Sequence, residues 1–409
     1  MAGRRHAAEH ESEHGALDQR QPGAQARQPH ARLSAVLHRG TRRPGRLPGQ
    51  PALSAPTGPR VEPLDFSSNP PGLNAAVFAA SAAVVWITGT KVAHYADDLA
   101  IASGIGHATV GLVLLAGITS LPEVAVALSS AAAGAPALSV NNLLGGVAMQ
   151  IAILAVADAI IGKQALTVIA GTPLLLLQGT ATVMLLLLFV AGVAVGDRPL
   201  LGEGAWSWGL LVLYLLSIWT IANAQGSRVW LVHKTQEQTE QAPVHEPTQT
   251  DGGHLKPLLL KLAAGAAVIL VAGFVLSRAG DAIAAQTGLG RNFVGAVFLA
   301  LSTSLPEISA VLAAVKLRRY EMAISDIFGT GLFNVALVFL VDAVYAGPPV
   351  LNEVGRFSLF AAVTAALLVC IYLVGLIERR DRTIARMGID SLAVLLAYAG
   401  SLAILYHLR

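Results

Sequence analysis

The chain has 409 residues, of which 54% are hydrophobic and only 13% charged, and its mean hydropathy is +0.60. This composition excludes a set of ordinary soluble domains, and apolar runs longer than ~18 residues indicate a polytopic integral membrane protein. The net charge is only +3, and 10 of the 28 Lys and Arg residues lie in the first 65 positions, so the basic balance does not indicate a nucleic-acid partner.

Residues 1–65 differ from the rest of the chain, because they are rich in Arg, His, Gln, Gly and Pro and have no apolar period. This composition predicts a disordered tail. The lack of an apolar core excludes a signal peptide. An alternative is a misassigned start near Val61 or Leu64, because the next methionine, Met149, lies deep inside the membrane region.

The remaining chain is predicted to be an all-α integral membrane fold with ten transmembrane helices. The predicted spans lie near 74–92, 98–130, 137–161, 167–195, 205–223, 255–276, 283–315, 321–345, 356–377 and 388–407. One long polar loop, 226–254, divides them into a first five-helix half at 72–225 and a second at 255–409.

The distribution of Lys and Arg over the short loops predicts a plasma-membrane protein with the 226–254 loop in the cytoplasm and both termini outside. The Arg-rich tail opposes this orientation, which favours the misassigned start. The side expected to be cytoplasmic collects Lys91, Lys163, Arg228, Lys234, Lys316, Arg318, Arg319, Arg379, Arg380, Arg382 and Arg386. The opposite side collects Arg198, Arg278, Arg291, Arg356 and Arg409.

An internal repeat is the most informative feature of the sequence. At a constant offset of 184 residues and without a gap, 97–159 aligns with 281–343, with 19 identities in 63 positions and an unbroken TSLPE block in both copies. Because each half has five spans, an odd number, the two copies enter the membrane from opposite sides. This predicts the inverted-repeat architecture of secondary transporters, whose binding sites lie near the midplane.

The TSLPE blocks place one acidic residue, Glu123 or Glu307, inside an apolar span of each half. An acid at that depth costs about 2.5–3.5 kcal/mol on insertion scales, so two at equivalent positions indicate a function. The neighbouring prolines free backbone carbonyls, which can line a cavity. Hydroxyl oxygens lie about one turn before each glutamate, at Thr119, Ser120, Thr303 and Ser304.

Two carboxylates, four hydroxyls and free carbonyls form an all-oxygen site of formal charge −2. Such a site suits Ca²⁺, which takes oxygen ligands, and it could also hold Na⁺ or protons. The other acids that recur in the repeat carry weaker signals. Asp97 and Asp281 lie near span edges, where helix-start and ion-entry roles are equally open, and Asp158 and Asp342 are interpreted as structural. His107 is interpreted as interfacial.

On these residues the sequence resembles the calcium/cation antiporter superfamily, specifically the membrane region of sodium/calcium exchangers. The hallmark of that family is a pair of repeats, each with a G-T-S-x-P-E block followed by a G-N-x-x-G-S-N-x-x-N-like block. The resemblance covers about 72–409 and implies ten helices in two inverted halves that work by alternating access. It also implies that Glu123 and Glu307 bind Ca²⁺, while hydroxyls and carbonyls of the blocks share the Ca²⁺ and Na⁺ sites.

The second block departs from the family pattern, reading NNLLGGVAMQ in the first copy and SDIFGTGLFN in the second. The family's serine position is Gly146 in one copy and Thr330 in the other, and its last position is Gln150 or Asn334. The resemblance therefore implies a ligand set completed by Gln150, Thr330 and Asn334. Asn334 is neutral where some exchangers carry an acid, which leaves the two glutamates as the charged ligands. Asn142 and Asp326 occupy the first Asn position and are expected outside the innermost ligands.

The function predicted is secondary antiport of cations, with Ca²⁺ exchanged against Na⁺, no bond made or broken and no cofactor. The partners expected are inorganic cations and the lipid bilayer. An alternative is Ca²⁺/H⁺ or Na⁺/H⁺ exchange, because two close carboxylates hinder each other's ionisation and can carry protons. An intramembrane hydrolase is disfavoured because no nucleophile is paired with a His and no HExxH motif occurs. A passive channel would conduct without counter-ion coupling.

Overall fold

The computed structural model describes residues 66, 68–104, 106–161, 165–224, 255–286, 297, 299–379, 383–384 and 387–408. The predicted tail at 1–65 and the predicted cytoplasmic loop at 226–254 lie outside the described residues, as do Lys163 and Arg291.

Helices account for nearly all of the described chain. The first half contains α1 (Pro71–Ser103), α2 (His107–Thr109), the π-helix η1 (Val110–Leu115), α3 (Ala116–Thr119), α4 (Leu121–Ala132), α5 (Pro136–Ile161), α6 (Leu166–Ile169), α7 (Pro173–Val195), the hairpin β1 (Pro199–Leu200) and β2 (Glu203–Gly204), and α8 (Ala205–Ala224). The second half contains α9 (Leu255–Gln286), α11 (Ala300–Thr303), α12 (Leu305–Lys316), α13 (Tyr320–Val344), the 3₁₀-helix η4 (Val350–Asn352), α14 (Arg356–Glu378), the hairpin β3 (Thr383–Ile384) and β4 (Met387–Gly388), and α15 (Ile389–Leu408).

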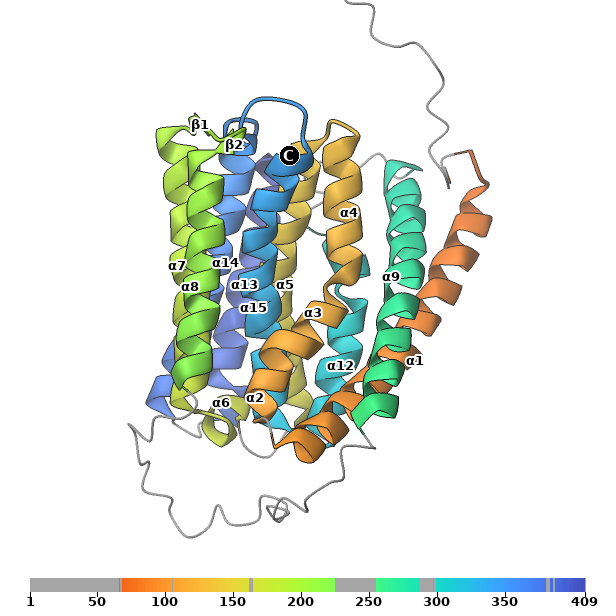
Figure 1. The fold of residues 1–409 in the computed structure, drawn as a ribbon, viewed down its shortest axis with the longest axis vertical. Helices are drawn as coiled ribbons and strands as arrows, with labels where there is room; N and C mark the ends of the chain where they lie inside the picture. The colour runs from red at the N-terminus through yellow and green to blue at the C-terminus, as the bar shows by residue number, and fades with distance from the viewer. Residues whose placement is uncertain are drawn as a thin grey trace, which may run out of the picture. The chain divides into compact units, whose positions relative to one another are not determined.

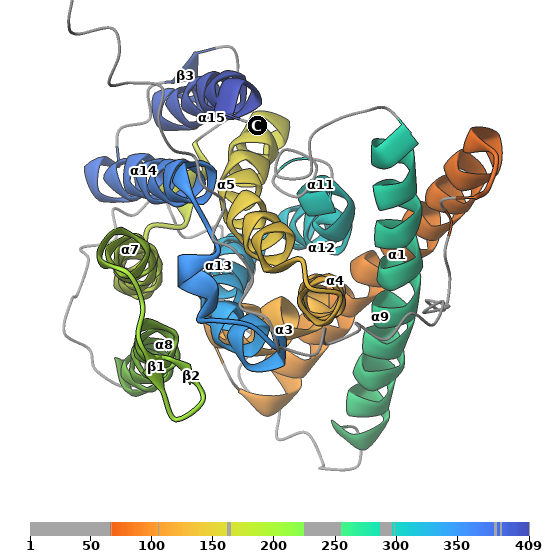
Figure 2. The ribbon, with the colours of Figure 1, turned by 90° about the horizontal axis from the view of Figure 1, so that it is seen from above.

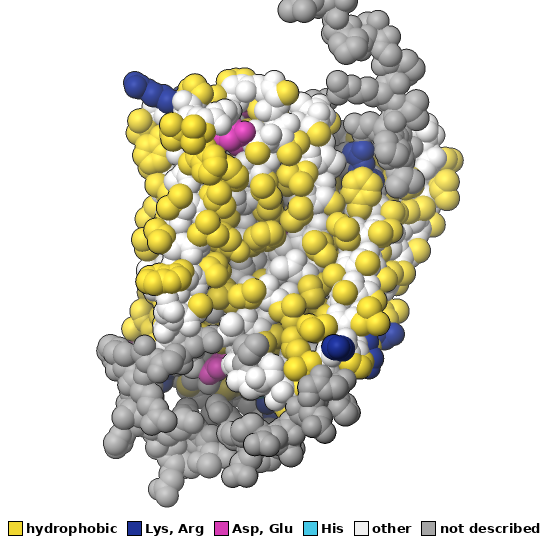
Figure 3. Space-filling view, in the orientation of Figure 1, with side chains coloured by type: hydrophobic (Ala, Val, Ile, Leu, Met, Phe, Trp, Pro, Cys, Tyr) yellow, Lys and Arg dark blue, Asp and Glu magenta, His cyan; other side chains and the backbone are white. Residues whose placement is uncertain are grey.

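Within the described residues, eight helices are long and apolar enough to cross a membrane: α1, α5, α7, α8, α9, α13, α14 and α15. A ninth candidate is the pair formed by His107–Thr119 and Leu121–Ala132, which bends by 46° at its break. Hydrophobic side chains cover the middle of the face in Figure 3, whereas its charged side chains lie toward the two ends. Both observations support a protein that crosses the membrane several times.

The boundary between the first two predicted spans is wrong. We expected the first span to end near 92, but α1 continues to Ser103, and the second span begins at His107. Gly104 ends α1 because it adopts the left-handed conformation, with φ of 70°, which is common just after a helix. Asp97, expected near a span edge, therefore lies inside α1.

Figure 2 shows α1 and α9 side by side at one edge of the bundle, with α4 and α12 next to them. The helices α5 and α13 follow, and α7, α8, α14 and α15 lie beyond. The helices α1 and α9 run in opposite directions (Figure 1). The side chain of Gln286, at the end of α9, donates to the carbonyl of Asn69, before α1, at 3.2 Å. The ammonium of Lys261, near the start of α9, lies 5.4 Å from the ring centre of Tyr95, near the end of α1.

Each of these two helices contacts the TSLPE block of the other half through a glycine. A Cβ atom on Gly89 of α1 would lie 3.0 Å from the carbonyl oxygen of Pro306, and one on Gly273 of α9 would lie 2.7 Å from Cβ of Pro122. Gly89 and Gly273 are themselves equivalent at the 184-residue offset. The first helix of each half therefore packs closely on the site-forming segment of the opposite half.

Two equivalent aspartates join the halves at the ends of α5 and α13. Asp158 accepts hydrogen bonds from the backbone N–H groups of Leu166, at 2.6 Å, and Gly388, at 2.7 Å. Asp342 accepts from Val350 and Gly204, both at 2.7 Å, and these donors are again 184 residues apart from those of Asp158. Both carboxylates bond to backbone groups, which agrees with their interpretation as structural residues.

Candidate functional site

Each TSLPE block interrupts its span just before the glutamate. Ser120 and Ser304 leave the helical conformation, with φ/ψ of −81°/3° and −81°/5°, and a proline follows in the first turn of α4 and of α12. Proline has no N–H to donate to the carbonyl one turn earlier, so it is tolerated at a helix start but not inside a helix. Glu123 and Glu307 consequently occupy the first turns of the new helices, where the partial positive charge of the helix N-terminus favours an anion.

A wide π-turn precedes the break in both halves. It forms η1 in the first half, and Val297 and Leu299 adopt the same conformation in the second. Glycines let α13 approach η1 closely: a Cβ on Gly111 would lie 2.6 Å from the carbonyl oxygen of Met322, and one on Gly329 would lie 2.5 Å from that of Leu112. π-Turns of this kind are frequent at functional sites.

Three buried carboxylates lie near these breaks. Glu123, Glu307 and Asp326 are each 0% exposed, and they lie close enough to interact electrostatically. The close packing of α13 on η1 turns Asp326, one helical turn before Thr330, toward Thr119, with 3.5 Å between Oγ1 of Thr119 and Oδ1 of Asp326. That Asp326 lies outside the innermost ligands stays a prediction.

The predicted hydroxyl groups lie around the carboxylates. The hydroxyl of Thr303 faces Glu123, and that of Thr119 faces Glu307, so each half supplies a hydroxyl to the acid of the other. Three of the four also donate to a backbone carbonyl three or four residues back, at 3.0 Å for Thr119, 2.7 Å for Ser120 and 3.2 Å for Thr303. Such back-bonding is common for hydroxyls in helices, and it leaves their lone pairs free to accept or to bind a cation.

The second block contributes buried polar groups as well. The hydroxyl oxygens of Thr330 and Ser120 lie 3.3 Å apart, within hydrogen-bond distance. The side-chain amides of Gln150 and Asn334 are 0% exposed and have no hydrogen-bond partner, and the same holds for Asn142. A Cβ on Gly146 would lie 3.2 Å from Nδ2 of Asn334, so the missing side chain at Gly146 leaves room for that amide.

Unpaired buried groups are concentrated at this place. Both carboxylate oxygens of Glu123 and of Glu307, one of Asp326, and the hydroxyl of Ser304 have no partner. A buried polar group without a partner costs about 1–3 kcal/mol, and more when it is charged, so the cluster has the character of a cation-binding site. Among the described residues, no ion pair reaches these three carboxylates, because the pairs present join Asp97 to His107 and Arg319.

The part of the chain that the structure describes contains no group of three His, Cys, Asp or Glu side chains with the geometry of a metal site. A cation here would instead be held by a mixture of carboxylate, hydroxyl, amide and carbonyl oxygens. That mixture suits hard cations such as Ca²⁺ and Na⁺ rather than zinc or copper.

Asp97 pairs with two basic side chains, which differs from the helix-start and ion-entry roles that its repeat position left open. Its carboxylate accepts from Nε of Arg319 at 2.6 Å and lies 2.9 Å from Nε2 of His107. The contact ties the end of α1 to the residue before α13. It also gives His107, interpreted as interfacial, a specific partner. The side chain of Asp281, which is equivalent to Asp97, lies outside the described part of the chain.

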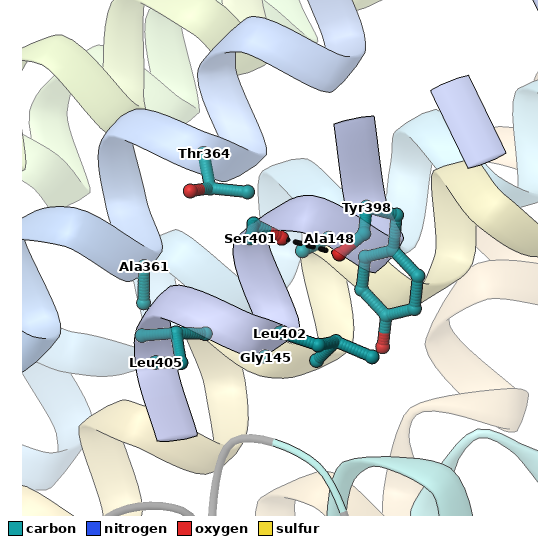
Figure 4. A pocket seen from close by; sticks show the side chains of 8 residues that line it. All are labelled: Gly145, Ala148, Ala361, Thr364, Tyr398, Ser401, Leu402 and Leu405. Carbon is teal, nitrogen blue, oxygen red and sulfur yellow. Dashed lines mark hydrogen bonds between the residues drawn. The ribbon is translucent and has the colours of Figure 1, made fainter. Parts of the chain in front are cut away.

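A crevice between α5, α14 and α15 is separate from the carboxylates. Figure 4 shows its lining, in which Ser401 donates to the carbonyl of Tyr398 at 2.7 Å. Small, apolar and hydroxyl-bearing side chains line it, without an acid or a base: Gly145, Ala148, Ala361, Thr364, Tyr398, Ser401, Leu402 and Leu405. The carboxylate cluster is therefore the candidate site.

Comparison with known proteins identifies a family and several relatives. Residues 73–222 and 257–407 each match the family model described as "Sodium/calcium exchanger protein". The relative named "Putative antiporter CaxA", from Alkalimonas amylolytica, is 26% identical over 325 residues, covering 78% of this chain and 93% of the relative. The inner membrane protein YrbG of Escherichia coli strain K12 is 28% identical over 241 residues, covering 59% of this chain and 70% of the relative.

Solved structures share the fold. The structure of the sodium-calcium exchanger NCX_Mj soaked with 10 mM Na⁺ and zero Ca²⁺ matches with a TM-score of 0.59 and 17% identity, covering 82% of this chain and 99% of that one. The same exchanger soaked with zero Na⁺ and Ca²⁺ matches with a TM-score of 0.58 and 16% identity, covering 81% of this chain and 99% of that one. At this identity the likeness concerns the fold.

Proposed function

The chain belongs to the sodium/calcium exchanger family, and from that premise we propose that it is a secondary antiporter exchanging Ca²⁺ against Na⁺ by alternating access. The observation that carries the proposal is the pair formed by Glu123 and Glu307. They are equivalent in the repeat, fully buried and without a hydrogen-bond partner. Two such carboxylates at membrane depth are costly unless a cation neutralises them.

The proposed architecture has ten transmembrane helices in two inverted halves, at 72–225 and 255–409. Nine candidates lie in the described residues, and the tenth would be the segment that ends with α11 and α12. Inversion is supported by the opposite directions of α1 and α9 (Figure 1) and by the mirrored glycine contacts with Pro122 and Pro306. The equivalent hydrogen bonds that backbone N–H groups donate to Asp158 and Asp342 support it as well.

In this proposal Glu123 and Glu307 hold the divalent cation between the halves. The neutral oxygens complete the ligand set as ions exchange, which lets one site accept either Ca²⁺ or Na⁺. They come from both halves and comprise Thr119, Ser120, Gln150, Thr303, Ser304, Thr330 and Asn334. The family resemblance implies that a helix pair slides to open the site to each side in turn. The α1–α9 pair, which packs on both TSLPE blocks through Gly89 and Gly273, is the candidate for that motion.

The proposed orientation places the end of the bundle that carries Lys316, Arg318 and Arg319 in the cytoplasm, together with the 226–254 loop. The opposite end carries Arg198 and Arg356. The asymmetry follows the rule that short cytoplasmic loops are rich in Lys and Arg. Both termini would then lie outside.

Proton coupling is the second candidate. Asp326 gives the site a third carboxylate, and within the described residues no base neutralises any of the three. Carboxylates that crowd together in a dry site share protons, so Ca²⁺/H⁺ or Na⁺/H⁺ exchange by the same residues is the specific alternative.

A transport assay separates these functions. We expect protein reconstituted in liposomes loaded with Na⁺ to accumulate radioactive Ca²⁺ when diluted into Na⁺-free medium, with little uptake when choline replaces the internal Na⁺. Uptake driven by a proton gradient but not by Na⁺ would select the proton alternative. Uptake independent of any gradient would contradict antiport, and empty liposomes serve as the control.

A further inference from the structure

The turns that follow α4 and α12 have the same geometry but different sequences. Each is closed by two backbone hydrogen bonds of 2.8–3.0 Å, and each residue involved lies 184 positions from its counterpart. The donor and acceptor pairs are Gly134–Ala131 and Ala135–Ser130 in the first half, and Arg318–Val315 and Arg319–Ala314 in the second. Both turns contain a left-handed residue, which is Gly134 with φ of 78° or Arg318 with φ of 59°. Glycine adopts this conformation without strain and arginine does not, so the turn itself does not account for the two arginines.

Arg319 binds the end of α1. Its Nε donates to Oδ1 of Asp97 at 2.6 Å, and the same oxygen lies 2.9 Å from Nε2 of His107. Asp97 is only 8% exposed, so its charge depends on these partners more than that of a surface carboxylate would. The position of His107 is basic in both halves, as His107 and Arg291, whereas the counterpart of Arg319 is Ala135, which has no group that binds an acid. The bridge to Arg319 is therefore a feature of one half alone.

This bridge joins the edge of the bundle to its core. Asp97 lies in α1, which packs against α9, α12 and η1, whereas Arg319 directly precedes α13. The α1–α9 pair is the candidate for the sliding motion of the proposed antiporter. When α1 slides past the start of α13, the carboxylate moves away from the guanidinium, so the bridge is made in one state and broken in the other.

Inverted symmetry decides what such a contact does to transport. In a transporter built of two inverted halves, the halves exchange conformations when the site turns from one side to the other. A contact that both halves make therefore stabilises both states equally, whereas a contact made by one half stabilises only one of them. The bridge between Asp97 and Arg319 is of the second kind, and it is formed in the state that the structure describes.

We propose that Arg319 is a positioning residue that holds α1 against the start of α13 through Asp97. It thereby stabilises the state in which the site is closed toward the end of the bundle that carries Lys316 and Arg318, the proposed cytoplasmic side. The inference rests on the function proposed above, because it concerns which side of the membrane the same site faces. The bridge includes neither glutamate, so it acts on this equilibrium rather than on the cation itself.

Spin labels report the position of α1 without any transport. Cysteines are placed at Ile101 of α1 and Ile160 of α5, two exposed residues near the same end of the bundle, and Cys370 is replaced by serine. Double electron–electron resonance in lipid nanodiscs then measures the distance between the labels. We expect the ratio of undocked to docked molecules to rise about fivefold in Arg319→Ala, which introduces the residue found at position 135.

Three variants separate the bridge from the turn. Arg318→Gly, the matched control, removes the neighbouring charge and restores the glycine of the first half, so it should keep the wild-type distances. Arg319→Lys retains the charge and should recover most of the docked population. Asp97→Asn should shift the distances as Arg319→Ala does, and the double variant should shift them no further, because both substitutions remove one interaction.

Transport gives a second readout, in vesicles of either orientation. We expect Arg319→Ala to lower the apparent KM for Ca²⁺ at the proposed cytoplasmic face relative to that at the outer face, changing their ratio about fivefold. Unchanged distances and an unchanged KM ratio would overturn the proposal, as would an equal loss of transport from both faces, which indicates a structural role alone. Should Arg319→Ala fail to fold, Asp97→Asn carries the same expectations. A wild-type protein that docks α1 but takes up no Ca²⁺ would instead refute the proposed function.

Discussion

Replacing Glu123 or Glu307 with glutamine is expected to reduce Na⁺-driven Ca²⁺ uptake by roughly 100-fold, which corresponds to about 2.8 kcal/mol. Glutamine preserves size and one oxygen but removes the negative charge that balances the cation in a water-free interior. Both carboxylates are fully buried, so no solvent charge can replace the lost one. Uptake rates of each variant in liposomes, normalised to the amount of protein inserted, measure the effect.

The matched control is Glu353→Gln, because Glu353 is an exposed acid that follows η4. It should transport like the wild type. Since the two glutamates are equivalent in the repeat and face hydroxyls of the opposite half, their losses should be similar in size. Wild-type uptake by either glutamine variant would contradict the role assigned to that residue.

A single methyl group at Gly329 is expected to reduce both stability and transport. A Cβ there would lie 2.5 Å from the carbonyl oxygen of Leu112 and 2.9 Å from Cβ of Ala116, so α13 would have to move away from the second span. Overpacking of this kind costs about 1–3 kcal/mol. Because the same contact brings Asp326 to Thr119, Gly329→Ala should lower the thermal midpoint of the purified protein and slow Ca²⁺ uptake together.

Gly117→Ala is the control, since a Cβ at Gly117 has open space in the same bent span. Alanine is the better helix former by about 1 kcal/mol, so that variant should be as stable as the wild type or more stable. Equal thermal midpoints for Gly329→Ala and Gly117→Ala would contradict the close approach of α13 to η1.

The candidate site could be predicted because two features of this single sequence indicate it. An acid inside an apolar span is costly, and its recurrence at the same place in two copies of TSLPE is not a property of composition. In the structure both glutamates are buried, and the hydroxyls of Thr303 and Thr119 face Glu123 and Glu307. The buried amides of Gln150 and Asn334 lie among the same unpaired groups.

Other features depend on packing that the sequence does not reveal. The approach of Asp326 to Thr119 is one of these features, because a motif position does not report how closely one helix approaches another. Here that approach depends on Gly111 and Gly329, whose missing side chains bring α13 against η1. Asp97 was assigned to a span edge because hydropathy falls at the acids of 97–98, but α1 continues past them to Gly104 and pairs Asp97 with Arg319.

Anomalous X-ray scattering from crystals soaked with Sr²⁺, a heavier analogue of Ca²⁺, would locate the divalent cation in the protein. We expect a peak between the carboxylates of Glu123 and Glu307, within about 2.3–2.6 Å or slightly more of oxygens from both halves, that disappears in Glu123→Gln. A divalent cation bound elsewhere in the membrane region, with the two glutamates left without an ion, would contradict it.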